Sequence, residues 1–132
     1  MREEISKLLN LTFLVHFFVA IIFGLVYLFL LDFYVDITGW PYKDPIAGRT
    51  LGAVFIGLAM ASLLCWRETE WKKVKIVVQL EMIWLIIGTI VQFWGAFFAN
   101  PRPPIIIWLN VVVMLFFCIA FSWFYYRQEM GK

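Results

Sequence analysis

Two side chains that can carry a proton lie inside long apolar segments of this sequence. His16, the single histidine of the chain, follows Lys7 by nine residues, and Glu81 follows Lys75 by six. At 1.5 Å of rise per helical residue, each group would lie roughly 9–13 Å along its helix from a charged end. An ionisable side chain inside a membrane helix is costly, so it is by default a candidate ion, proton or ligand site.

The chemistry of this pair can be interpreted in two ways. If their helices are neighbours, a static hydrogen bond between His16 and Glu81 is the favoured interpretation, and a proton relay is the alternative. Glu81 alone could also be satisfied by a neighbouring helix or by Lys75. Cys118 has the chemistry of a third metal ligand, but no spacing supports a cluster, so we expect no metal.

Enzyme motifs do not support a catalytic function. The sequence has no GxSxG element, no glycine-rich phosphate loop and no dinucleotide fingerprint. We therefore assign no catalytic residue and no cofactor, and an enzyme is the less favoured class.

A second polar group is expected near the other end of the helices. Arg49 begins one apolar segment, and Gln92 and Asn110 lie at a similar level on two others. We expect Arg49 to pair with an acid of the adjoining loop, and an external vestibule for a polar head group is the alternative. The candidate acids are Asp32, Asp36 and Asp44.

Small residues recur at helical spacing and predict helix packing. Ala53, Gly57 and Ala61 are spaced by four, and Gly24 and Gly88 occupy similar rows on their own segments. Small side chains let membrane helices approach closely, so packing is the favoured role of these rows.

The composition indicates a membrane protein. Of the 132 residues, 64% are hydrophobic and 15% are charged, whereas soluble domains average roughly 45–50% and 25%. A soluble chain of this size has too little interior to bury so much apolar surface. A net charge of +2 gives no indication of nucleic-acid binding.

Four apolar segments predict the architecture, at about 8–31, 45–66, 76–98 and 104–126. Each is long enough to cross a hydrocarbon core of about 30 Å as a helix. We predict an all-α, single-domain bundle of four transmembrane helices over residues 1–132, antiparallel in up-down-up-down order. Asp44 followed by Pro45 predicts the start of the second helix, and residues 32–42 are expected to form a loop.

Lysines and arginines predict the orientation. Eight lie at the two chain ends and in the loop 67–75, and three lie on the opposite side. Because cytoplasmic segments carry the excess of positive charge, we predict a multi-pass protein of the cell membrane with both termini in the cytoplasm.

Three function classes remain at this stage. The leading hypothesis is a protein that binds or passes a small solute, ion or proton through a bundle or oligomer with an intramembrane Glu/His site. The alternative is a structural or accessory subunit of a larger membrane complex. A membrane enzyme that acts on a lipid or quinone is third. The expected partners are the lipid bilayer and either further copies of the chain or a larger membrane complex.

The orientation can be tested with reporter fusions. A reporter fused after Lys132 should be active as a cytoplasmic protein, and one inserted near Tyr42 should be active as an external protein, because of the charge bias. Activity on the reverse sides would disprove the predicted topology.

Overall fold

The computed structural model describes residues 4–131, and the chain is entirely helical apart from its connections and one isolated β-bridge between Glu4 and Glu70. This confirms the predicted all-α class. Arg2 and Lys132, which contribute to the charge bias, lie outside the described residues. The five helices are α1 (Lys7–Phe29), α2 (Leu31–Thr38), α3 (Pro45–Trp66), α4 (Trp71–Phe98) and α5 (Ile106–Met130).

Four of these helices, α1, α3, α4 and α5, are long and apolar enough to cross a membrane. Asp44 caps α3 as predicted, since its side chain accepts hydrogen bonds of 2.9 Å from the backbone N–H groups of Ile46 and Ala47. Helix α4 begins at Trp71, five residues before the predicted segment, because the lysine-rich stretch 72–75 forms a helical turn and not a loop.

Helix α2 corrects the prediction of a loop at residues 32–42. Leu31 is buried, and Tyr34 and Val35 are half-buried, so residues three and four apart form one face against the bundle. Gly39 ends the helix with a left-handed backbone (φ 68°), and its N–H bonds to the carbonyl of Val35. The acids of this segment are exposed, and their presence had favoured the loop interpretation.

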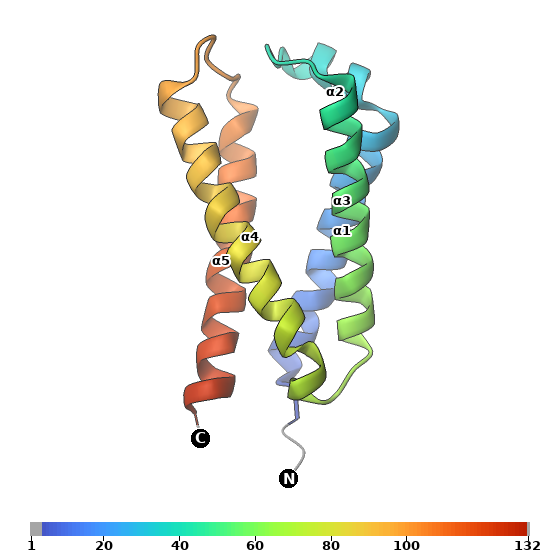
Figure 1. Ribbon diagram of the computed structural model, residues 1–132, viewed down its shortest axis with the longest axis vertical. Helices are drawn as coiled ribbons and strands as arrows, with labels where there is room; N and C mark the ends of the chain where they lie inside the picture. Colours follow the sequence, from blue (N-terminus) through green and yellow to red (C-terminus); the bar gives the residue numbers. More distant parts are fainter. Residues whose placement is uncertain (1–3, 132) are drawn as a thin grey trace.

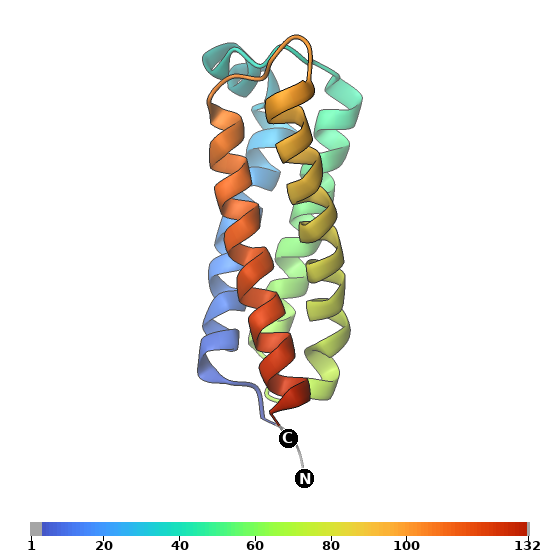
Figure 2. The ribbon, with the colours of Figure 1, turned by 90° about the vertical axis from the view of Figure 1, so that its left-hand side faces the viewer.

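The long helices form two pairs. Helix α1 packs along α3, and α4 packs along α5. Figure 1 shows the pairs apart at the end that carries α2, while the lower half of α4 leans toward α1 and α3. We call the end with α2 the mouth and the end with the α3–α4 connection and both chain ends the base; Figure 2 shows the same division from the side of α4 and α5.

Large side chains hold the pairs together at the base. Trp71, Phe13 and Phe121 are almost completely buried there, together with smaller apolar groups from all four long helices. This base core consists of Leu9, Phe13, Cys65, Trp71, Val74, Val78, Leu85, Phe117 and Phe121.

Glycines bring α1 and α3 into backbone contact. A Cβ atom added to Gly52 would lie 2.7 Å from the Leu28 nitrogen and 2.9 Å from the Gly24 carbonyl oxygen. The row predicted for packing on α3 lies beside this contact, since Ala53 and Gly57 are exposed and nothing lies within 4 Å of a Cβ added to Gly57.

The other predicted packing residues have different surroundings. Ala61 is half-buried. A Cβ atom added to Gly88 would meet the terminal methyl of Met114 on α5, which makes Gly88 a contact point of the α4–α5 pair.

The contact of α1 with α3 predicts unequal effects of the same substitution at two glycines of α3. Gly52→Val should destabilise the protein by about 1–3 kcal/mol, because the added atoms meet backbone that cannot move aside. Gly57→Val is the matched control and should leave stability nearly unchanged. Heating followed by size-exclusion chromatography in mild detergent measures the difference, and equal melting temperatures would contradict the described packing.

Candidate functional site

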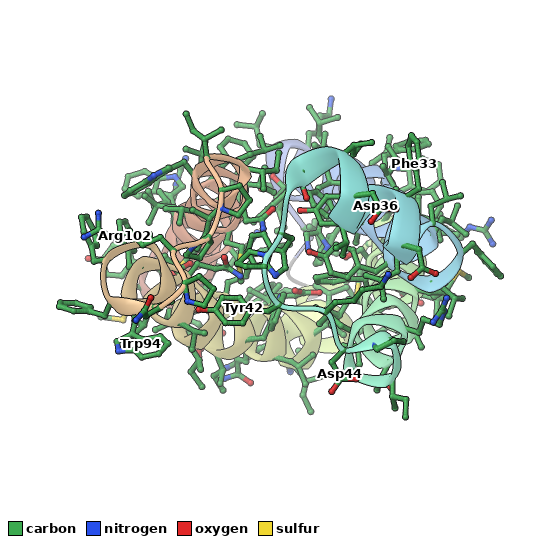
Figure 3. All side chains as sticks on the ribbon, turned by 90° about the horizontal axis from the view of Figure 1, so that it is seen from above. Phe33, Asp36, Tyr42, Asp44, Trp94 and Arg102 are labelled. Carbon is green, nitrogen blue, oxygen red and sulfur yellow. The ribbon has the colours of Figure 1, made fainter. Side chains whose placement is uncertain are left out.

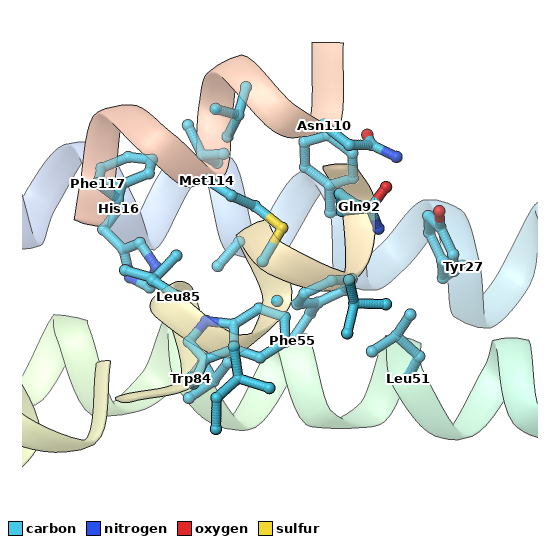
Figure 4. Close-up of a pocket in the computed structure, with 18 residues that line it drawn as sticks. His16, Tyr27, Leu51, Phe55, Trp84, Leu85, Gln92, Asn110, Met114 and Phe117 are labelled. Atoms are coloured by element: carbon cyan, nitrogen blue, oxygen red, sulfur yellow. The ribbon is translucent and has the colours of Figure 1, made fainter. Parts of the chain in front are cut away.

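A cavity of about 450 Å³ lies between the two helix pairs. Its walls are mostly apolar and aromatic, and all four long helices contribute (Figure 4). None of the described residues that line it is an aspartate, glutamate, lysine or arginine. We call this space the inner cavity; its rings come from Phe23, Tyr27, Phe55, Trp84 and Phe117.

A second cavity of about 590 Å³ lies at the mouth, beneath α2 and residues 40–44. It shares Tyr27, Leu51, Gln92 and Asn110 with the inner cavity. The two spaces therefore adjoin at these four residues, on the side of the inner cavity that faces the mouth.

The pairs are linked at the mouth by few contacts. The Tyr42 hydroxyl donates a hydrogen bond to the Pro101 carbonyl and so joins the α2–α3 connection to the α4–α5 connection. Figure 3, viewed from the mouth, shows Tyr42 reaching between the two halves, with Asp44 on one side and Arg102 on the other.

Arg49 lies at the mouth on α3 and makes the type of pair predicted for it. Its guanidinium lies 3.2 Å from an Asp32 carboxylate oxygen, and the Lys43 ammonium lies 2.9 Å from the other oxygen. The hydrogen bond and charge of Lys43, followed by Arg49, lower the pKa of Asp32, so the carboxylate stays ionised at neutral pH. Because all three groups are solvent-exposed, the cluster links α2 to α3 but contributes little stability.

Gln92 and Asn110 lie at the junction of the two cavities, away from the Arg49 ion pairs. Asn110 is only 8% exposed, and the side-chain oxygens of both amides have no hydrogen-bond partner among residues 4–131. The Trp84 indole nitrogen in the wall also has none. A buried polar atom without a partner costs about 1–3 kcal/mol, and all three atoms belong to residues that line the inner cavity.

His16 lies at the floor of the inner cavity. Its Nδ1 is 2.7 Å from the Ser62 hydroxyl of α3, and its ring makes edge contacts with Phe117 and Phe121 of α5 at 4.7 and 5.5 Å between centroids. These contacts fix the plane of the imidazole and direct Nε2 toward α4.

Glu81 lies behind His16 on α4 and is completely buried. Its Oε2 is 3.6 Å from His16 Nε2, so the structure brings the two proton-carrying side chains together. Neither Glu81 oxygen has a hydrogen-bond partner among the described residues. A carboxyl group so enclosed is costly when it is charged unless a cation balances it.

The base core closes the site on the other side. Phe13, Val74, Val78 and Phe121 have no exposed surface and lie between the His16–Glu81 pair and the base. The ion pair of Lys75 with Glu129, at 2.8 Å, lies beyond this apolar layer. The pair is therefore adjacent to the cavity and separated from the base.

Several residues of this site were missed by sequence reasoning. Ser62, Trp84 and Tyr27 lie among common membrane residues, and their roles depend on which face each helix turns inward. Ser62 carried a usable signal, since the sequence places its hydroxyl at helical spacing from the small residue Ala59, and the structure buries it completely. No group of three metal-ligating side chains occurs within residues 4–131.

Comparison with known protein families, with curated proteins and with solved structures finds no match. Function is therefore argued from the geometry of the site.

The junction of the cavities predicts a pattern of chemical accessibility. In a chain with Cys65 and Cys118 replaced by alanine, Asn110→Cys should react with a membrane-impermeant thiol reagent added to intact cells, because Asn110 lines both cavities and the predicted orientation turns the mouth outward. Val112→Cys, two residues along α5 and 62% exposed on its outer surface, should react at least tenfold more slowly because it would face lipid. Equal rates would contradict access through the mouth.

Proposed function

We propose that the protein is an integral membrane protein whose four long helices cross the bilayer in alternating directions. The length and apolar character of these helices support this, and so does the charge bias toward the base end. By that bias the base faces the cytoplasm and the mouth, with α2, faces outward.

Within this arrangement the inner cavity binds a small, largely apolar solute that arrives from the mouth. One observation carries the proposal: a cavity of about 450 Å³ with apolar walls is lined by a few polar residues, and side-chain atoms of three of them have no hydrogen-bond partner within the described chain. Binding sites for small molecules typically have this size and composition. Gln92 and Asn110 would orient the solute, and His16 would form the floor.

All four long helices of one chain line the cavity. Transport is a further step, because it requires the base core to open. Assembly with further copies or with a larger complex is a separate property of the outer surface.

A second candidate function is that of an accessory subunit. The observation that favours it is the exposed row of Ala53 and Gly57 on α3, which would allow another membrane helix to approach closely. This role would use the outer face of α3 and not the cavity.

Filling the cavity tests solute binding. Val113→Trp places an indole in the wall of the inner cavity and should displace the bound solute. Native mass spectrometry of protein purified in mild detergent should detect a small molecule on the unmodified chain, with occupancy reduced at least tenfold in the variant.

The control is Val112→Trp, which adds the same group to the outer surface of the same helix. It should keep the bound molecule. A solute that remains in both variants would lie elsewhere, and the absence of any bound molecule from the unmodified chain would contradict the proposal.

A further inference from the structure

The His16–Glu81 pair has a charge that only one proton can neutralise. Without a shared proton the pair carries one negative charge, with one proton it is neutral, and with two it carries one positive charge. A net charge inside an apolar interior is costly unless a counter-charge lies nearby. The described lining of the inner cavity supplies no acidic or basic side chain besides His16 itself, so the protein without a ligand holds one proton on the pair.

The groups that face the pair leave this charge uncompensated. From α3, Ser62 bonds to the imidazole and the thiol of Cys65 belongs to the base core. From α5, the rings of Phe117 and Phe121 cover the imidazole. These groups supply no positive charge, so loss of the shared proton leaves one negative charge at the cavity floor.

The remaining walls suit a positively charged ligand. Phe55 touches Phe23, Tyr27 and Trp84, with centroid distances of 5.8–6.2 Å, so four rings form one aromatic surface. The faces of such rings attract organic cations. At the junction with the second cavity, Gln92 and Asn110 each have a buried side-chain oxygen without a hydrogen-bond partner among the described residues, and the partial negative charge of such oxygens favours a positive charge nearby.

We propose that the inner cavity exchanges the proton of the His16–Glu81 pair for one lipophilic organic monocation. The cation arrives from the mouth, the pair releases one proton to the same side, and the negative charge left on the pair balances the bound cation. Both charge and protons are conserved, since one monovalent cation replaces another. This inference rests on the proposed binding function and adds the charge class of the solute.

Three probes of nearly equal shape test the charge class. The first is the cation 1-methylquinolinium, the second is the neutral 1-methylnaphthalene, and the third is the anion 1-naphthoate. Isothermal titration calorimetry of the detergent-solubilised full chain, repeated in two buffers of different ionisation enthalpy, measures the affinity and the number of protons released. The cation should bind at least tenfold more tightly than either analogue and should release one proton per cation. Its Kd should fall tenfold for each unit of rising pH while the pair is protonated.

Variants assign the proton to the pair. Glu81→Gln should remove both the proton release and the preference for the cation, and it should still bind the neutral probe. Glu68→Gln, which removes a carboxylate of the base connection outside the cavity, should change neither. If Glu81→Gln does not fold, the number of protons that the unmodified chain releases per bound cation tests the exchange instead.

Two results would overturn the inference. One is binding of the neutral probe as tight as that of the cation without proton release, and the other is no binding of the cation. Either result would leave the proposed binding function standing if mass spectrometry detects a solute that Val113→Trp displaces. Loss of that solute signal from the unmodified chain would remove the binding function itself.

Discussion

The contact between the two helix pairs is made mainly at the base, where Trp71, Phe13 and Phe121 are almost completely buried. Above these side chains the two pairs lie apart (Figure 1). The α1–α3 pair stays narrow because Gly24 and Gly52 allow backbone contact. The helices pack closely within each pair, and large side chains join the pairs only at the base. The inner cavity therefore lies between the pairs on the mouth side of the base core.

The sequence predicted the features that depend on one segment at a time. Apolar run length identified four long helices, and Asp44 with Pro45 identified the start of α3. Helix α2 was not predicted because its exposed acids suggested a loop, although Leu31 is buried and Val35 half-buried on one face. The contact of α3 with α1 uses Gly52, whereas the predicted row of Ala53 and Gly57 is exposed beside it, because neighbouring residues of a helix face in different directions.

Features that depend on several helices at once were beyond sequence reasoning. Depth along the helix showed that His16 and Glu81 could lie at comparable levels, but only the arrangement of α1 and α4 brings them to 3.6 Å. The sequence grouped Gln92 and Asn110 with Arg49. In the structure the two amides line the cavity, whereas Arg49 pairs with Asp32 outside it. No sequence pattern predicts the cavity, since the residue types that form its walls are common throughout the chain.

Because the inner cavity reaches the mouth while the base core closes the other side, any passage of a solute would require the pairs to move relative to each other. Such movement would favour rotation of whole pairs, since α1 with α3 and α4 with α5 pack far more extensively than the pairs pack with each other. His16 and Glu81 lie on opposite pairs, α1 and α4. A change in the charge of either residue would therefore act across the contact between the pairs, which would have to open for a solute to pass. Under the proposed exchange, a proton on this pair would therefore set both the charge of the cavity floor and the attraction between the two halves of the molecule.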